Sequence, residues 1–220
     1  MKIVILGYSG FIGQSIKDNL YRNSTFNLAC VGRNIKKKFD KNSRVKYFEW
    51  DFVSFKKDNL SFLQKGDIII NCAGKTNNNS DNLEYINIIF LKKLLKYICR
   101  YKLNIRLINL SSISVYGGFQ NYLNRCKLIT ENTSTKTNDD YSKSKLKGDK
   151  LIENVVKKNL NKNFSFTILR ISNVFGNKNN SNLYNFILFL LKIGLWIRSS
   201  DKVMYNFINV NDVSKAITKV

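Results

Sequence analysis

Tyr141 and Lys145 are the two residues whose types and spacing most directly suggest chemistry. They are four residues apart in a segment of helical character, so they share one face of a helix. A free tyrosine has a pKa of about 10 and is a poor base at neutral pH, but a neighbouring ammonium favours the phenolate and lowers that pKa. Such a pair can move a proton to or from a hydroxyl group while a hydride moves to or from a nicotinamide.

A serine-rich segment precedes this pair. It follows an apolar run at residues 105–110 and has the sequence Ser111-Ser112-Ile113-Ser114-Val115-Tyr116-Gly117. A serine at the carboxyl end of a central parallel strand can hydrogen bond the oxygen that Tyr141 protonates, because ligands of such sheets bind at that edge. The Tyr-x-x-x-Lys spacing alone is not specific in a chain with 11 tyrosines and 37 basic residues. The motif becomes specific because a glycine loop, the serine segment and the Tyr141–Lys145 pair follow one another in this order along the chain.

The glycine loop lies at the start of the chain, between a short apolar run and a segment of helical spacing. Its sequence is Gly7-Tyr8-Ser9-Gly10-Phe11-Ile12-Gly13. Gly7 permits a tight turn, Gly10 lets backbone approach phosphates, and Gly13 lets the helix pack on the strand. The helix N-terminus then faces the anion, so the loop predicts a pyrophosphate site for a dinucleotide.

The end of the second predicted strand indicates which dinucleotide binds. NAD-binding proteins usually carry an acidic residue there, whereas this chain has Arg33, followed by lysines at residues 36–38. An arginine would pair with a 2′-phosphate that an acid would repel. We therefore favour NADP(H), with NAD(H) as the alternative. Asp51 ends the third predicted strand, where its side chain can accept a hydrogen bond from the adenine amino group.

Apolar runs and segments of helical spacing alternate along the chain. We predict strands at residues 2–6, 27–32, 45–50, 67–73, 105–110 and 165–171, and helices at residues 11–22, 82–101 and 141–158. This alternation predicts the α/β class, a doubly wound parallel sheet of the Rossmann type. Residues 117–140 form an irregular stretch too long for a passive connector. The apolar segment at residues 183–197 predicts a substrate-lobe or dimer helix, or an ordinary buried helix.

Charge and composition limit the other classes of function. The net charge is +22, but the lysines are scattered, which favours a solvated surface on an enzyme of anionic ligands over a nucleic-acid binder. The chain has no histidine, so histidine-based catalysis and histidine metal sites are excluded, and we expect no metal. The four cysteines, Cys30, Cys72, Cys99 and Cys126, form no CxxC pair. Together with the lack of a signal-peptide pattern and of a membrane-spanning run, they favour a cytoplasmic location.

With these pieces in place, the chain resembles the extended short-chain dehydrogenase/reductase family, the NAD-dependent epimerase/dehydratase group. The resemblance covers essentially the whole chain, and the combination of motifs is specific for the family but not for a substrate. The matching pieces are Gly7-Tyr8-Ser9-Gly10-Phe11-Ile12-Gly13, Asp51, Asn71-Cys72-Ala73-Gly74, Ser111-Ser112 through Val115-Tyr116-Gly117, Tyr141 through Lys145, Leu169-Arg170-Ile171-Ser172-Asn173-Val174-Phe175-Gly176 and Phe207-Ile208-Asn209-Val210-Asn211-Asp212-Val213. The resemblance implies an enzyme of a nucleotide-diphosphate sugar, in surface polysaccharide biosynthesis.

The resemblance also implies roles for single residues. Ser112 is then the catalytic serine, Tyr141 the acid/base, and Lys145 its partner and the anchor of the ribose. Asn173 would face the substrate diphosphate, and residues 117–140, with Glu131 among them, would cover the sugar. The residues implied in cofactor binding are Gly7, Ser9, Gly10, Phe11, Ile12, Gly13, Arg33, Asp51, Ala73, Gly74, Tyr141 and Lys145.

The chain departs from the family pattern near its end. No proline follows Gly176, and Asn209 and Asn211 stand where family members often carry histidine and aspartate. Family members usually continue well beyond the position of Val220. We therefore expect a dinucleotide-binding domain with the catalytic residues at 1–176 and a partial, C-terminally truncated substrate lobe at 177–220.

Several functions remain open within and beyond this family. A 4,6-dehydratase needs an acid pair at the places of Ile113 and Ser114, so we favour a 4-epimerase or a 4-keto reductase. Arg33 favours the reductase slightly, because reductases exchange NADPH at each turnover whereas epimerases retain NAD. The alternative from another class is a non-catalytic or decayed dinucleotide-binding module. The resemblance also implies a possible homodimer, since dimers through a four-helix contact are common in the family.

Overall fold

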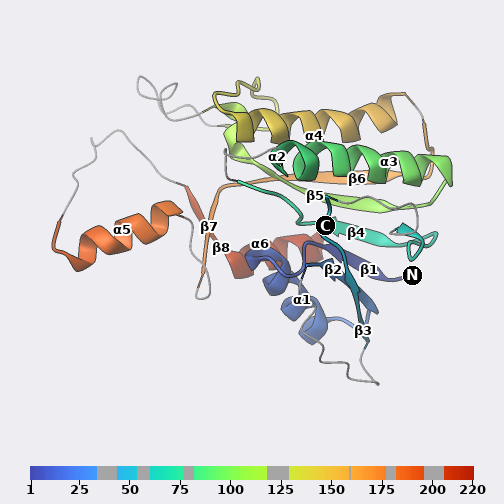
Figure 1. Cartoon of the computed structure of the whole chain (residues 1–220), viewed down its shortest axis with the longest axis horizontal. Helices are drawn as coiled ribbons and strands as arrows, with labels where there is room; N and C mark the ends of the chain where they lie inside the picture. The colour runs from blue at the N-terminus through green and yellow to red at the C-terminus, as the bar shows by residue number, and fades with distance from the viewer. Residues whose placement is uncertain are drawn as a thin grey trace.

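The computed structural model describes residues 1–33, 44–53, 60–76, 82–117, 129–158, 160–176, 182–195 and 206–220. Its main body is a six-stranded parallel sheet in the order β3-β2-β1-β4-β5-β6 (Figure 1). The strands are β1 (Ile3–Leu6), β2 (Leu28–Gly32), β3 (Val45–Glu49), β4 (Ile68–Asn71), β5 (Arg106–Ser112) and β6 (Ser165–Ile171). The order reverses between β1 and β4, as in doubly wound dinucleotide-binding sheets, and confirms the predicted fold class.

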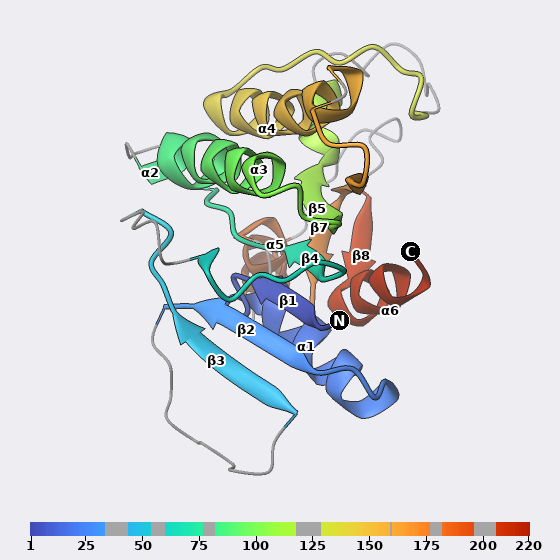
Figure 2. The same ribbon diagram turned by 90° about the vertical axis from the view of Figure 1, so that its right-hand side faces the viewer.

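Two pairs of helices cover the two faces of this sheet (Figures 1 and 2). Helices α1 (Phe11–Asn23) and α6 (Val210–Lys219) lie on one face, and α3 (Phe90–Arg100) and α4 (Asp140–Lys157) lie on the other. Successive side chains of β1 point to opposite faces. Val4 and Leu6 join the hydrophobic cluster of α3 and α4, whereas Ile3 and Ile5 join the cluster of α1 and α6. The sheet is therefore buried on both faces, as its continuous apolar runs predict.

The segment predicted as one helix at residues 82–101 is interrupted. The short helix α2 (Asn82–Glu84) leads into a π-helix at Tyr85–Ile89, and α3 begins only at Phe90. Asn87 is the buried residue of this π-helix, and its side chain forms hydrogen bonds outside the helix. Single π-turns of this kind re-aim side chains and are frequent at functional sites.

The strand predicted at residues 67–73 is also shorter than expected, since β4 spans Ile68–Asn71. Asp67 is fully buried before it, where its carboxylate accepts hydrogen bonds from the Lys2 ammonium at 2.7 Å and from the backbone N–H of Gln64 at 2.8 Å. Asp67 and Ala73 are thus both buried although they lie outside β4. The backbone of Ala73 lies against Gly7 of the glycine loop.

A second, smaller sheet pairs β7 (Asn173–Phe175) with β8 (Phe207–Asn209) in parallel. Helix α5 (Asn182–Lys192) projects away from the main body in Figure 1. Leu188, Phe189 and Leu191 are exposed on it, so the alternative of an ordinary buried helix is wrong for this part of the chain. No helix within the described ranges is long and apolar enough to cross a membrane.

Helices α3 and α4 lie side by side on one face of the sheet (Figures 1 and 2). Lys92, Lys96 and Arg100 recur every four residues on α3, opposite its buried side, and all three are exposed. Lys147 and Lys150 are exposed on α4. We call the exposed basic residues of these two neighbouring helices, Lys92, Lys96, Arg100, Lys147 and Lys150, the basic face.

Candidate active site

The glycine loop joins the end of β1 to the start of α1. Gly7 has a φ of 79°, and a Cβ atom there would lie 2.8 Å from the backbone nitrogen of Ala73. A Cβ atom on Gly13 would lie 2.3 Å from the carbonyl oxygen of Gly7. Both positions therefore exclude a side chain. Gly10 is the N-cap residue of α1, whose first turn holds no acidic residue. The N–H groups of that turn can receive an anionic phosphate.

The side chains between these glycines take different directions. Ser9 Oγ lies against the last residue of β2, 2.9 Å from where a Cβ atom on Gly32 would be. Ile12 packs against the hydrophobic cluster of α1 and α6. The Phe11 ring lies beside Gly176, 3.1 Å from the place of a Cβ atom there. The structure thus directs Ile12 and Phe11 to packing, which leaves their backbone N–H groups, rather than their side chains, for a cofactor.

The residues predicted to read the adenosine end lie at neighbouring strand ends. The Trp50 N–H donates to the Gly32 carbonyl at 3.0 Å, which brings the ends of β2 and β3 together. Arg33 directly follows Gly32 and is exposed, and Asp51 directly follows Trp50 and is also exposed. The Asp51 carboxylate accepts the N–H of Val53 at 3.0 Å. Residues 36–38 and Cys126 lie outside the described ranges.

The loop after β4 connects the glycine loop to the catalytic helix. Asn87 holds this loop, because its amide accepts the Lys75 N–H and donates to the Lys75 carbonyl, each at 3.1 Å. The same amide donates to Ser144 Oγ on α4 at 2.9 Å. A Cβ atom on Gly74 would lie 3.0 Å from the Lys145 ammonium. The π-helix therefore fixes the spacing between the β4 loop and α4, a role that sequence reasoning missed.

The three predicted catalytic side chains converge at the carboxyl end of β5. Tyr141 and Lys145 lie on the first turns of α4, and the Lys145 nitrogen is 6.0 Å from the centre of the Tyr141 ring. Ser112, the last residue of β5, hydrogen bonds the Tyr141 hydroxyl and accepts the N–H of Ser114 at 3.2 Å. The Lys145 ammonium donates to the Leu110 carbonyl at 3.0 Å. The helix spacing and the strand end thus bring together residues 29 and 33 positions apart in the sequence.

Burial controls the proton affinities of this group. It raises the pKa of Tyr141, an effect that the hydrogen bond from Ser112 opposes and the Asp139 carboxylate adds to. The net shift of the Tyr141 pKa is therefore upward, opposite to the expected lowering, because burial outweighs the other effects, and the Lys145 ammonium donates its hydrogen bond to the Leu110 carbonyl rather than to the phenol. Burial also lowers the pKa of Lys145 to about 8, and the Asp149 carboxylate opposes that shift.

A buried ion pair behind these residues was also missed by sequence reasoning. Asp149 lies one turn beyond Lys145 on α4 and is 0% exposed. Its Oδ2 accepts from Arg170 Nε at 3.1 Å and from Ser111 Oγ at 3.0 Å. Arg170 Nη1 donates to the Tyr116 hydroxyl at 2.7 Å. The sequence did hold a signal for Asp149, because Tyr141, Lys145 and Asp149 are polar residues that recur every four positions.

The remaining predicted site residues lie apart from this group. Asn173 is half-buried in β7, where it pairs with Phe207 of β8. Glu131 is exposed in a turn. Residues 118–128, which belong to the stretch expected to cover a sugar, are outside the described ranges.

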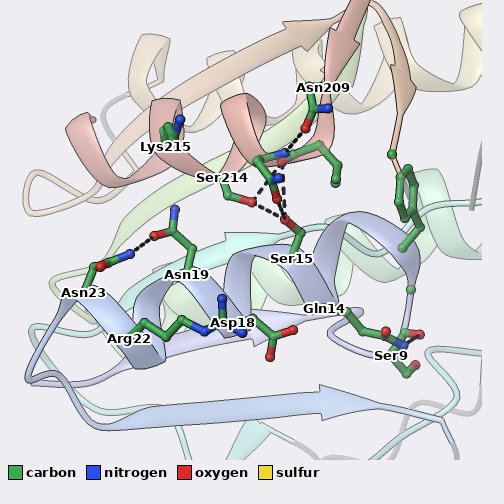
Figure 3. Close-up of a pocket in the computed structure, with 15 residues that line it drawn as sticks. Ser9, Gln14, Ser15, Asp18, Asn19, Arg22, Asn23, Asn209, Ser214 and Lys215 are labelled. Carbon is green, nitrogen blue, oxygen red and sulfur yellow. Dashed lines mark hydrogen bonds between the residues drawn. The ribbon is translucent and has the colours of Figure 1, made fainter. Parts of the chain in front are cut away.

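A polar cavity of about 610 Å³ lies between α1 and α6 (Figure 3). It starts at Ser9 and Gly10 of the glycine loop and runs along α1 to Asn23. Ser15 and Ser214 point towards each other across it, with hydroxyl oxygens 2.8 Å apart. Neither Tyr141 nor Lys145 lines this cavity, so we place the chemistry at the sheet edge and treat the cavity as the polar seam between the two helices.

The six-stranded parallel sheet has a glycine-rich turn at the end of its first strand and a Ser-Tyr-Lys group at the end of its fifth. This strand order and these two features together define a Rossmann-type enzyme fold. The sequence pattern of the NAD dependent epimerase/dehydratase family matches residues 3–220, and the chain belongs to this family. No curated protein sequence matches the chain.

Solved structures of several sugar-nucleotide enzymes share the fold. The UDP-glucuronic acid 4-epimerase of Bacillus cereus, solved with NAD and a fluorinated UDP-sugar, is 20% identical with a TM-score of 0.78, over 99% of this chain and 72% of its own. The UDP-Glc/GlcNAc 4-epimerase of Campylobacter jejuni is 19% identical with a TM-score of 0.75, over 98% and 72%. The dTDP-glucose 4,6-dehydratase of Bacillus anthracis, in complex with NAD, is 21% identical with a TM-score of 0.76, over 99% and 70%.

Proposed function

We propose that the chain is an NAD(P)-dependent enzyme that epimerises or reduces a nucleotide-diphosphate sugar. The observation that carries this proposal is the convergence of Ser112, Tyr141 and Lys145 beside the loop of Gly74 and the glycine turn. The family and the substrates named for the similar structures support it. Ile113 and Ser114 in place of an acid pair favour these reactions over a dehydration.

The residues of the site fit a dinucleotide. The space that Cβ atoms would fill at Gly7 and Gly13, and the open first turn of α1, suit a pyrophosphate. Ser9, Ala73 and Gly74 would line it, and Lys145 would hold the ribose. A bound nicotinamide supplies or accepts the hydride. Tyr141 gives a proton to, or takes one from, the sugar oxygen, and Ser112 holds that oxygen by a hydrogen bond.

The test of this mechanism compares Tyr141→Phe with Tyr101→Phe, a change at an exposed tyrosine far from the site. Binding of NADH and NADPH is followed by nicotinamide fluorescence, and turnover of UDP-glucose and UDP-glucuronic acid by chromatography. Tyr141→Phe should keep cofactor binding and lose about 100-fold or more in kcat, because proton transfer typically contributes that much. Tyr101→Phe should match the unchanged chain.

Two outcomes would contradict the proposal. Full turnover by Tyr141→Phe would remove the tyrosine from the mechanism. Cofactor binding with no turnover of any sugar nucleotide, and with no effect of Tyr141→Phe, would identify a non-catalytic dinucleotide-binding module instead.

We infer a preference for NADP(H) from Arg33, which is exposed beside the last residue of β2. A guanidinium there pairs with a 2′-phosphate. Arg33→Ala should therefore weaken NADPH binding by about tenfold and leave NADH binding unchanged, whereas Lys46→Ala, at an exposed position on β3, should change neither. Equal effects on both cofactors, or tightly retained NAD(H), would refute the preference and favour an epimerase.

The wider context of the enzyme belongs to the same proposal. It includes a division into a dinucleotide-binding part at residues 1–176 and a substrate lobe at residues 177–220. By the family resemblance, Asn173, at the start of β7, would face the diphosphate of the sugar. The proposal further includes a cytoplasmic location, a homodimer and a role in surface polysaccharide synthesis.

A further inference from the structure

Asp149 occupies an unusual place for a carboxylate. It is fully buried on α4, at four and eight residues from Lys145 and Tyr141, so the three side chains lie along one face of the helix. Its Oδ1 has no hydrogen-bond partner among the described residues. A buried carboxylate with an unpaired oxygen is costly, so its presence needs a reason.

The bonds of Oδ2 tie the helix to two strands. Ser111 and Arg170 are cross-strand neighbours on β5 and β6, and both donate to Asp149 Oδ2. The Arg170 guanidinium also lies 5.2 Å from the centre of the Tyr116 ring, and its Nη1 donates a hydrogen bond to the Tyr116 hydroxyl. Asp149 therefore anchors the strand end at which Ser112 follows Ser111.

Lys145 needs a negative partner. Among the described residues its ammonium donates one hydrogen bond, to the uncharged Leu110 carbonyl. The titratable groups that act on it are Asp149 on its own helix and the Cys72 thiol after β4. Burial raises the pKa of Cys72 to about 12, so this thiol is neutral at physiological pH. Burial raises the pKa of Asp149, and the hydrogen bonds from Ser111 and Arg170 oppose that shift, so Asp149 is the one carboxylate that acts on Lys145 in the described part of the chain.

We propose that Asp149 is a positioning residue for the proton-transfer pair, whose carboxylate keeps Lys145 charged while its bonds to Ser111 and Arg170 fix the strand end that presents Ser112. This inference rests on the proposed function for its consequence in catalysis, but not for the interaction itself. Lys145 must carry its charge to favour the Tyr141 phenolate and to hold a ribose.

Asp149→Asn tests the charge at almost unchanged shape, because the amide oxygen can still accept from Ser111. The first readout needs no turnover. The rate of acetylation of each lysine is measured against pH in the full chain by mass spectrometry. The titration midpoint of Lys145 should fall by about one pH unit, the lower end of the effect of a close opposite charge. Exposed Lys150 is the internal control, and Glu153→Gln, on the same helix, is the control variant.

The second readout is the dependence of kcat on pH. If the pKa of Lys145 falls from about 8 to about 7, the charged fraction at pH 8 falls about fivefold, and at pH 6 it hardly changes. We therefore expect Asp149→Asn to lower kcat about fivefold at pH 8 and little at pH 6. The KM of the sugar nucleotide should stay within twofold. A conservative Asp149→Glu should recover part of the loss, whereas a purely structural defect would lower kcat equally at both pH values.

The outcomes separate this inference from the proposed function. An unshifted Lys145 midpoint overturns the inference even if the enzyme turns over. A shifted midpoint without a pH-dependent loss of kcat overturns the positioning role. If no sugar nucleotide is turned over, the proposed function fails, and the acetylation result still decides whether Asp149 sets the charge of Lys145.

A failure of Asp149→Asn to fold has its own test. The same substitution is then made in the Lys145→Met background. Recovery of folding would mean that the uncompensated Lys145 charge was the cause, which supports the interaction. No recovery would mean that Asp149 serves Arg170 and the fold alone, which overturns it.

Discussion

Replacement of Gly13 by alanine should damage the glycine loop and the whole domain with it. The added Cβ atom would lie 2.3 Å from the Gly7 oxygen and 2.7 Å from the Tyr8 Cα, whereas ordinary contacts begin at 3.4 Å. The loop and α1 must therefore separate by about 1 Å. Overpacking of this kind typically costs about 1–3 kcal/mol.

An opposing term must be weighed. Alanine is more favourable than glycine in a helix interior by about 1 kcal/mol, and Gly13 is the third residue of α1. The contact involves backbone atoms on both sides, which cannot rotate away, so the clash should outweigh this gain. We expect a net loss of up to about 2 kcal/mol, which corresponds to a Tm lower by up to about 8 °C in a chain of this size.

Gly10→Ala is the matched control for stability, because its Cβ atom would lie 3.3 Å from the same Gly7 oxygen and needs a movement of only a few tenths of an ångström. Thermal unfolding of both variants is followed by far-UV circular dichroism, and NADH and NADPH binding by fluorescence. Gly13→Ala should lose at least tenfold in affinity for both cofactors, since the phosphate-facing turn moves. A Tm and an affinity equal to those of the unchanged chain would refute the packing argument.

Three further predictions concern buried polar groups. Burial lowers the pKa of Lys145 to about 8, so the folded chain loses this proton at lower pH than the unfolded chain; denaturant titrations should show stability rising between pH 8 and 9.5 relative to Lys145→Met, and equal profiles would contradict this. Burial raises the pKa of Cys30 and Cys72 to about 12, so iodoacetamide at pH 8 should leave both thiols unmodified until the chain unfolds, as peptide mass spectrometry can establish. Asn87→Ala should cost about 1–3 kcal/mol in urea unfolding and weaken cofactor binding, because the bridge from Lys75 to Ser144 is lost; unchanged binding would show that the bridge does not hold the β4 loop.

The sequence predicted the fold and the grouping of the site well, because both depend on local patterns. Apolar runs specify buried parallel strands, and three glycines at a strand end specify a turn into a helix. The pairing of Tyr141 with Lys145 follows from helix geometry alone. To place Ser112 in the site, one further inference was needed, namely that the end of β5 lies beside α4. The parallel arrangement of the sheet supports this inference.

The features that the sequence did not predict arise from tertiary contacts. A helical period cannot distinguish α3 from the π-helix that precedes it, because Asn87 takes its partners from the β4 loop and from α4. The Asp149–Arg170 pair joins residues 21 positions apart on different elements. The raised pKa of Tyr141 reflects burial, which no spacing of residues reports. The exposed apolar side of α5 likewise looked like core from composition alone.

The basic face of α3 and α4 has a consequence for assembly. If two copies met through these helices, Lys92, Lys96, Arg100, Lys147 and Lys150 of one copy would approach the same five cations of the other. Like charges on both sides repel until counterions screen them, and the screening length falls from about 30 Å at 0.01 M to about 8 Å at 0.15 M ionic strength. Self-association through this face would therefore strengthen as salt is added. A chain that is monomeric in low-salt buffer can therefore dimerise in buffer of higher ionic strength. Its oligomeric state should be given together with the ionic strength at which it was measured.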